Sequence, residues 1–375
     1  MSMKAKAIVG LDVHALQTHA AILDPVSGEL RVSKLRVPPL EVVSFLESLG
    51  AEVRAVYEAG PTGFGLARYL IDAGIECAVA APSKLQRPSG DRVKTDARDA
   101  RHLARLLHLG EIVAVAIPTV EQEAARDMVR ARADCRGDLM TARHRVSKLL
   151  LRQGIVYYGG RAWTGKHELW LRTQRFDTPG LQQAYDAAFD AMLTALDRRD
   201  RLDREIEALA ANSIFTPVVR RLGCLRGVST LTAFGLAAEI GDWTRLSGRS
   251  IGAYLGLVRT EYSSGSTRVQ GGVTKTGNSY ARRLLAEAAW HHRPRYRPGQ
   301  DLRRRWDAAS PAARARGQAA NARLHAPVGA LRCAQEMPCG RQRGDRPRAR
   351  RLVLVTGSTR RVGPTFVRMN IRWCR

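Results

Sequence analysis

The chain has 375 residues, of which 45% are hydrophobic and 26% are charged. This length gives room for two or three domains with buried cores, and the hydrophobic content excludes a wholly disordered chain. No run reaches the roughly 18 apolar residues of a membrane-spanning helix, and the N-terminus lacks an apolar signal region. We therefore expect a soluble, cytoplasmic protein. The six cysteines match neither a disulfide framework nor a zinc site; they are Cys77, Cys135, Cys224, Cys333, Cys339 and Cys374.

The charge is strongly positive, with 61 Lys and Arg against 35 Asp and Glu and a formal net charge of +26. Such a balance favours polyanionic partners, above all nucleic acid. The charge is unevenly distributed, since residues 300–375 contain 18 Arg, no Lys and four acidic residues and so carry +14. The first 299 residues, at +12, are still basic enough to bind phosphates.

The N-terminal part alternates short apolar, β-branched runs with amphipathic segments. The pattern predicts three strands, then a helix, a strand, a helix and a last strand, at residues 7–14, 19–24, 30–37, 39–50, 52–60, 62–74 and 75–82. Gly50 is suited to the end of the first helix. The order indicates an α/β domain with a meander followed by helix-connected strands, which is the order of the ribonuclease-H-like fold.

The middle of the chain is predicted to be helical. Residues 96–153 are rich in Ala, Leu and Arg, a looser stretch follows at 154–180, and residues 181–212 read as one long helix. A helix of that length has to pack against another element, so we expect a coiled-coil-like hairpin or a dimer contact. This region is interpreted as a helical linker without chemistry of its own.

A second compact unit is predicted at residues 222–298. Residues 222–243 have the outline of a helix-hairpin-helix, with a turn at Gly227, and such hairpins direct backbone N–H groups at nucleic-acid phosphates. A glycine- and serine-rich segment follows and ends in a helix before Trp290.

The tail from about residue 325 combines Arg, Pro, Gly and Cys without an amphipathic period. We favour a frameshift in a GC-rich gene as its origin; a disordered basic arm that adds affinity for nucleic acid is the alternative. The expected divisions of the chain are 1–118, 119–221, 222–298 and a basic tail at 299–375.

Four carboxylates stand out by position: Asp12 on the first strand, Glu58 at the end of the fourth, and Asp96 and Asp99 on one face of a helix. Alone, each of the first two would be an ordinary core or edge carboxylate, and the last two a solvated helix face. Together they could converge on a pair of hard divalent cations, which prefer oxygen ligands and stabilise both oxygens at a reacting phosphorus.

Several segments resemble the transposases of bacterial insertion sequences of the IS110 type. They are GLDVH at 10–14, YEAGPTGFGLARYL at 57–70, the run ending KTDARDARHLARLL at 107, and LGLVRTEYSSGSTRVQGGVTKTGNSYARRLL at 255–285. The resemblance covers roughly residues 7–298. It implies an N-terminal RuvC-like domain of ribonuclease-H fold, a coiled-coil connection and a C-terminal transposase domain.

The resemblance also implies a chemistry for these residues. It places a metal-binding DEDD quartet on Asp12, Glu58, Asp96 and Asp99, with Mg²⁺ as the cofactor at two sites. It further implies a seryl nucleophile, donor and target DNA as substrates, a structured bridge RNA that pairs with both, and a homo-oligomer, either a dimer or a tetramer.

The serine implied by the resemblance lies in YSSGSTR. Taken bare, a Ser-Ser-Gly run is a surface turn, and a serine hydroxyl is a poor nucleophile until a base, a metal or a positioned phosphate activates it. We favour Ser263 slightly over Ser264. Nearby basic side chains are candidate phosphate clamps, namely Arg259, Arg268, Lys275 and Arg282.

We therefore predict a DNA transposase that cuts and rejoins strands through a phosphoseryl link. One alternative is a metal-dependent nuclease of the Holliday-junction-resolvase kind, in which the four acids hydrolyse DNA without a covalent intermediate. Another is a non-catalytic nucleic-acid-binding protein. A sugar-kinase-like ATPase would need a second glycine-rich phosphate loop around an Asp, which the sequence lacks.

Overall fold

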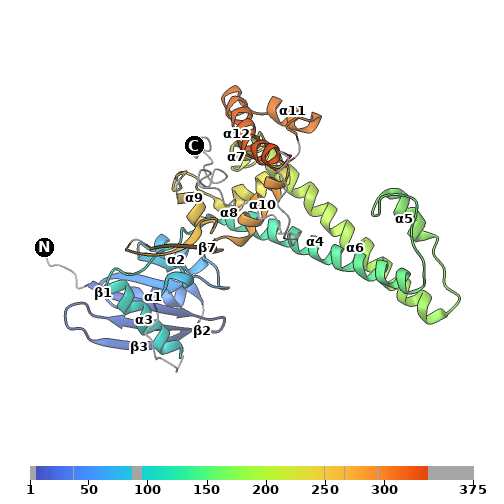
Figure 1. Ribbon diagram of the computed structural model, residues 1–375. Coiled ribbons are helices and arrows are strands. Elements are labelled where there is room, and N and C mark those ends of the chain that lie inside the picture. The colour runs from blue at the N-terminus through green and yellow to red at the C-terminus, as the bar shows by residue number, and fades with distance from the viewer. Residues whose placement is uncertain are drawn as a thin grey trace. The chain divides into compact units, whose positions relative to one another are not determined.

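The computed structural model describes residues 6–36, 38–86, 95–248, 250–265, 267–293 and 295–336 (Figure 1). The chain divides into two compact units, Met1–Thr119 and Val120–Arg375, and each is described by itself. Across the described ranges, no helix is both long and apolar enough to cross a membrane. The predicted tail beyond residue 336, with Cys339 and Cys374, lies outside the described residues.

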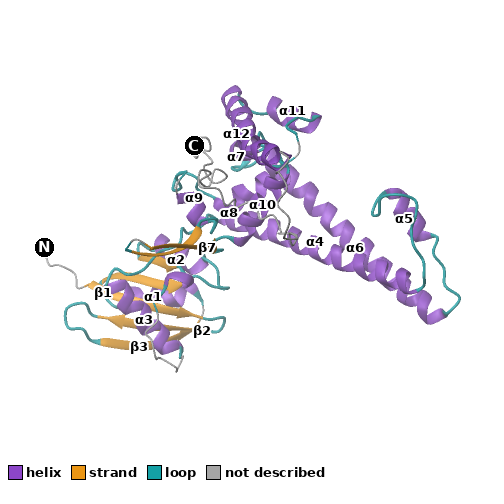
Figure 2. Ribbon diagram, viewed as in Figure 1, coloured by secondary structure: helices purple, strands orange, loops and turns teal. Residues whose placement is uncertain are grey.

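The first unit is built on a five-stranded sheet with the strand order β3-β2-β1-β4-β5. β1 pairs antiparallel with β2 and parallel with β4, while β5 pairs parallel with β4. Figure 2 shows the strands in orange and the helices in purple. The strands are β1 (Lys6–Val13), β2 (Gln17–Leu23), β3 (Leu30–Arg36), β4 (Glu52–Glu58) and β5 (Glu76–Ala80). Each strand predicted from the first 82 residues is present, and the predicted mixed α/β fold is confirmed.

Helices cover both faces of this sheet. α1 (Pro39–Ser48) and α2 (Gly65–Asp72) pack on the face that receives Val9 and Leu11 of β1. α3 (Asp96–His108) packs on the other face, which receives Ile8 of β1 and Val56 of β4. Because side chains alternate along a strand, Asp12 and Glu58 follow Ile8 and Val56 onto the α3 side. A short 3-10 turn, η1 (Pro82–Lys84), follows β5.

Gly10 allows α3 to lie directly against β1. A Cβ atom built on Gly10 would come 2.1 Å from the carbonyl oxygen of Ala100 and 2.5 Å from the amide nitrogen of Ala104. Only glycine tolerates such an approach of two backbones. This contact brings the first turn of α3 close to the end of β1.

The helical stretch predicted at 96–153 is interrupted in the structure. α3 ends at His108 and α4 (Val120–Arg152) begins after an extended segment. In that segment Gly110 has φ +71°, and Ala114 forms a bridge with Ala80 at the edge of the sheet. The stretch predicted to be helical therefore contains two helices, because the glycine turn and the edge pairing stop α3 before α4 begins.

The second unit contains a long helical hairpin. α6 (Pro179–Ala211) runs antiparallel to α4, with Tyr185 and Phe189 packed near Leu149 at one end and Ile206 near Val129 at the other (Figure 1). The partner expected for the long helix is therefore α4. The looser connection contains one further helix, α5 (Gly165–Arg172). A true coiled coil stays a prediction.

The remaining core of this unit gathers short helices around Phe234, Leu222 and Leu236, which are fully buried. The helices are α7 (Thr216–Leu222), α8 (Thr230–Ile240), α9 (Ser250–Tyr254) and α10 (Ser279–Trp290). α7 and α8 flank the turn at Gly227, whose φ is +81°. The glycine- and serine-rich segment forms a two-stranded hairpin that the sequence pattern did not reveal, β6 (Arg259–Ser264) and β7 (Thr267–Val273).

The C-terminal boundary differs from the expected one. α11 (Gln300–Asp307) and α12 (Pro311–Glu336) occupy residues that were expected to begin the basic tail. Leu302, Trp306 and Ala313 are buried in the same core as α8. Placing the start of the tail at residue 299 was wrong, because these apolar side chains are needed to close that core.

Candidate functional site

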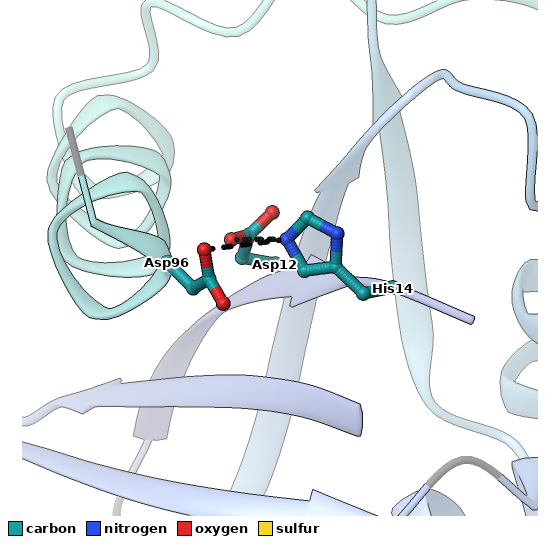
Figure 3. Close-up of side chains that lie close together, drawn as sticks. All are labelled: Asp12, His14 and Asp96. Carbon is teal, nitrogen blue, oxygen red and sulfur yellow. Dashed lines mark hydrogen bonds and ion pairs between the residues drawn. The ribbon is translucent and has the colours of Figure 1, made fainter. Parts of the chain in front are cut away.

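Two carboxylates and a histidine gather where β1 meets α3 (Figure 3). Nε2 of His14 lies 3.1 Å from Oδ2 of Asp12 and 3.5 Å from Oδ1 of Asp96. One ligand atom from each of the three residues lies within 4.8 Å of the other two. The group has the spacing of a metal-binding cluster, and its side chains come from two elements far apart in the sequence.

Local structure explains why these groups meet. Asp12 lies near the carboxyl end of β1, a position from which side chains reach the rim of the sheet. Asp96 opens α3, where the side chain of Thr95 caps the helix by accepting from the amide of Arg98. The close approach at Gly10 sets the distance between them. An acidic first turn is also favoured by the positive end of the helix dipole.

The other two predicted carboxylates lie beside this cluster. Leu11 pairs with Tyr57 across the parallel strands, so Glu58 occupies the position next to Asp12 on the same face. Asp99 follows one turn after Asp96 on α3, and its charge acts on Asp12. Neither Glu58 nor Asp99 belongs to the tight group of three.

The electrostatics favour a cation between these groups. Burial raises the pKa of Asp12 above its ordinary value, the hydrogen bond and charge of His14 oppose that shift, and the charges of Asp96 and Asp99 add to it. The Asp12 side chain is only 18% exposed. Carboxylates enclosed together repel one another unless a proton or a metal ion neutralises them.

Three polar neighbours of the carboxylates were not predicted from the sequence: His14, Gln17 and His19. Nε2 of Gln17 donates to Oδ2 of Asp96 over 3.3 Å. Nδ1 of His19 lies 3.6 Å from the same oxygen and is buried without a hydrogen-bond partner among the described residues. His14 was detectable, because residues two apart on a strand share a face. The position of His19 depends on the β1–β2 register, in which His19 pairs with Asp12.

The predicted serines lie on the exposed β6–β7 hairpin. The Ser263 hydroxyl donates to Oε1 of Glu261 over 2.9 Å. Arg268 donates to both oxygens of the same carboxylate, each over 2.9 Å, and Gln270 donates to Oε2. The hydrogen bonds of Arg268, Gln270 and Ser263, in that order, lower the pKa of Glu261 to about 2.

The base of the hairpin is held by the TKTGN segment. A Cβ atom on Gly277 would come 2.0 Å from the carbonyl oxygen of Tyr254, and Gly277 has φ +70°. Nη1 of Arg282 donates to the carbonyl oxygens of Leu255 and Thr276. Asn278 caps α10 and donates to Glu239 over 2.6 Å. These contacts fix the hairpin on the helical core.

The four predicted phosphate clamps differ in their contacts. Arg268 pairs with Glu261, and Arg259 donates to Gln270 over 3.5 Å. Arg282 holds the TKTGN segment, and Lys275 takes a left-handed conformation with φ +56° within it. Contact of these four side chains with phosphate stays a prediction.

Comparisons with known proteins connect both parts of the chain to transposition. A family model described as a transposase, that of the DEDD transposases of IS110, matches residues 9–154. The model of the transposase IS116/IS110/IS902 family matches residues 219–306. The first match includes the acidic cluster, and the second includes the serine hairpin.

Whole-chain relatives agree with these matches. A protein of Sinorhizobium fredii named as a transposase, y4qE, is 39% identical over 294 residues, 77% of this chain and 72% of that protein. The transposase for insertion sequence element IS1533 of Leptospira borgpetersenii is 33% identical over 305 residues, 78% of this chain and 86% of that protein. The transposase for element IS1111A of Coxiella burnetii is 25% identical over 226 residues, 59% of this chain and 61% of that protein.

A mixed α/β unit with carboxylates gathered at its strand ends, matched by a DEDD model, places the chain among the DEDD transposases. The similarity to relatives over most of its length makes the assignment more specific. The chain belongs to the IS110 family of insertion-sequence transposases.

Proposed function

We propose that this transposase cuts and rejoins DNA strands with a seryl nucleophile from the β6–β7 hairpin and a Mg²⁺-dependent site formed by Asp12, Glu58, Asp96 and Asp99. The observation that carries the proposal is the gathering of Asp12, His14 and Asp96 at one edge of the sheet. The enzyme would act in the cytoplasm on the donor and target DNA of its element.

The sheet supports a ribonuclease-H-like, RuvC-like assignment of the first unit. Its order β3-β2-β1-β4-β5, with an antiparallel meander followed by two parallel strands, is the order expected for that fold. In open α/β sheets, sites form beyond the carboxyl ends of parallel strands. Asp12 and Glu58 occupy that edge on neighbouring strands.

The donor set fits a divalent cation. When bound, a pair of Mg²⁺ ions supplies charge stabilisation for the attacking and leaving oxygens of a phosphodiester. The carboxylates of Asp12 and Asp96 would hold the metal, with Glu58 and Asp99 completing the set. Because Mg²⁺ prefers oxygen, His14 acts as a hydrogen-bond partner that orients Asp12, and Gln17 orients Asp96.

The serine gives this enzyme a way to rejoin strands without ATP. Attack by the Ser263 or Ser264 hydroxyl on a phosphodiester forms a phosphoseryl bond, which conserves the energy of the broken bond until a DNA hydroxyl attacks it. The serine and the carboxylates lie in different compact units of the chain. We infer a homo-oligomer in which one subunit supplies its serine to the carboxylates of another.

The nucleic-acid partners follow from the charge and the family. A net charge of +26 supports binding of both DNA and RNA. We infer that a structured bridge RNA guides the enzyme by pairing with donor and target DNA. The turn at Gly227 and the N-terminus of α8, capped by Ser229, are suited to hold a phosphate backbone.

The test is whether the protein becomes attached to DNA. The full chain, purified with its bound nucleic acid, is incubated with Mg²⁺ and a nicked DNA from which the cut product cannot be rejoined. We expect a covalent protein–DNA complex that survives denaturant and maps to Ser263 or Ser264. Sequencing of the bound RNA checks the inferred guide.

A metal-dependent nuclease gives the opposite result. In such a nuclease the carboxylates and their metal ions hydrolyse DNA to free ends, and no protein stays attached to the DNA. Free ends with no adduct, or recombination that persists when Ser263→Ala and Ser264→Ala are tested separately, would overturn the seryl mechanism. An adduct that maps to Tyr262 would do the same.

A further inference from the structure

The two serines of the hairpin have different surroundings. Glu261 and Ser263 are two apart on β6, share one face of the strand, and are joined by the 2.9 Å hydrogen bond from the serine hydroxyl. Ser264 points to the opposite face, and its side chain makes no hydrogen bond with any residue that the structure describes. A carboxylate within hydrogen-bond distance of a hydroxyl has the geometry that proton abstraction needs.

We propose that Glu261 is the general base that takes the proton of Ser263, so that Ser263 and not Ser264 is the nucleophile. This inference rests on the seryl mechanism proposed above. A new bond forms between Oγ of Ser263 and the phosphorus as the bond from phosphorus to the leaving DNA oxygen breaks. The hydroxyl proton passes to Glu261, and the leaving oxygen takes a proton from water.

The rejoining step uses the same pair in reverse. A DNA hydroxyl attacks the phosphoserine, the bond between phosphorus and Oγ breaks, and Glu261 returns its proton to Oγ. The incoming hydroxyl loses its proton to water. Glu261 therefore acts as base in cleavage and as acid in rejoining, as microscopic reversibility requires.

Arg268 determines when Glu261 is basic enough to act. Its guanidinium contacts both oxygens of the carboxylate, while Gln270 and Ser263 supply the other hydrogen bonds to that group. A phosphodiester competes for the same guanidinium, because arginine binds phosphate oxygens in a bidentate manner. When the scissile phosphate draws Arg268 away, the carboxylate loses its strongest partner and becomes a better base next to the serine.

The pairing of Glu261 with Arg268 suits a serine hydroxyl that is exposed to solvent. Ser263 and Glu261 are both exposed, and Arg268 is 68% exposed. A base that is held inactive until DNA arrives protects the exposed serine from reacting without its substrate. The hairpin thus supplies the nucleophile, its base and the cation that senses the phosphate from two adjacent strands.

The test measures the rate of covalent adduct formation by the full chain on nicked DNA, together with DNA affinity. Glu261→Gln keeps an oxygen that accepts the serine hydrogen bond but loses the ability to take a proton. We expect the rate to fall at least about a hundredfold, with Glu261→Asp recovering part of it. DNA affinity should not fall, because the substitution frees Arg268 to bind phosphate. The control is Glu287→Gln, an exposed carboxylate of the same unit paired with Arg136, which leaves the rate unchanged.

A cysteine at the same position separates a base from a merely structural contact. A thiol ionises far more readily than a hydroxyl and depends less on a base. In a Ser263→Cys background, Glu261→Gln is therefore expected to cost less than about tenfold. An equal loss in both backgrounds would show that Glu261 only shapes the hairpin.

The outcomes distinguish this inference from the mechanism on which it rests. Absence of any adduct from the unaltered protein overturns the seryl mechanism itself. An adduct that maps to Ser264, or an unchanged rate in Glu261→Gln, leaves the seryl mechanism intact and overturns the assignment of Glu261 and Ser263.

Discussion

Asp12 is an acidic side chain that stands between two apolar residues of β1, Leu11 and Val13. Leu11 beside it is fully buried, and burial raises the pKa of Asp12 itself. An ionised carboxylate in such a place is costly unless a hydrogen bond, a proton or a cation compensates. His14 supplies the hydrogen bond, and the proposed metal ion supplies the cation.

The quartet is tested by isosteric neutral substitutions. Asp12→Asn, Glu58→Gln, Asp96→Asn and Asp99→Asn should each lower recombination at least about a hundredfold, because each removes a charge that holds the metal. RNA binding should stay nearly unchanged, since it depends on the basic surface. The control is Glu76→Gln, an exposed carboxylate that pairs with Arg54 on the same sheet. Full activity in any one variant would remove that residue from the quartet.

His292 allows a test of stability against pH. Burial lowers the pKa of His292 to about 4, well below the value of about 6.5 expected in the unfolded chain. Between these values the unfolded chain binds a proton that the folded chain does not, so acidification from pH 7 to pH 5 destabilises the fold by about 2 kcal/mol. Chemical unfolding at both pH values checks this. In His292→Gln the loss between pH 7 and pH 5 should be smaller by that amount; an equal loss would contradict it.

The site residues differ in how far the sequence could reveal them. Asp12 and Asp96 lie in short motifs and meet in the structure. His14 follows the same strand alternation and was overlooked. His19 and Gln17 depend on the β1–β2 register, which brings His19 opposite Asp12. Glu261 could not be singled out, because its link to Arg268 depends on strands that the sequence pattern did not predict.

At the scale of elements, prediction succeeded where burial leaves a clear apolar pattern. The helices of the first unit have one buried face, so apolar residues recur with a period of 3.6. The central strands β1 and β4 are covered on both faces and read as short apolar runs. The strands of the β6–β7 hairpin were not predicted, because most of their residues are exposed on both faces and so show no apolar alternation. α12 was missed because its Ala- and Arg-rich sequence has only a weak apolar stripe, although Ala313 is buried.

The geometry of the site depends on Gly10, which allows α3 to pack closely against β1. Gly10→Ala would place a methyl group against the backbone of Ala100 and Ala104, so α3 has to move away from β1. We expect the free energy of unfolding to fall by about 1–3 kcal/mol or more, as for other overpacked sites. Recombination activity should also fall, because Asp96 moves away from Asp12. Thermal unfolding and recombination assays check both. Gly65→Ala, where a Cβ meets open space, is the matched control.

At the scale of the whole molecule, the proposed catalytic side chains and the largest concentration of positive charge lie in different parts of the chain. The carboxylates belong to Met1–Thr119, and the serine hairpin belongs to Val120–Arg375. Residues 300–375 carry 18 of the basic side chains, all arginine. Part of that stretch is structural, since Arg305 and Trp306 donate to the carbonyl oxygens of Gly223 and Cys224.

Two truncations separate the structural part of the C-terminal region from the rest. Removing residues 299–375 takes away Leu302, Trp306 and Asn321, and with Asn321 go the hydrogen bonds to the amide of Arg226 and the carbonyl of Cys224. Loss of one large core side chain alone costs about 3–5 kcal/mol, a large share of the roughly 5–15 kcal/mol that stabilises a domain. We therefore expect this chain to lose its cooperative thermal transition.

Removing only residues 337–375 should leave that transition in place, because this segment is rich in Arg, Pro and Gly without an amphipathic period. Its loss removes eleven arginines and one aspartate, so affinity for DNA and RNA should weaken and depend less steeply on salt. Calorimetry and binding titrations at two salt concentrations measure the two effects. A cooperative transition that survives loss of residues 299–375, or one that disappears with residues 337–375 alone, would refute this division of the C-terminal region.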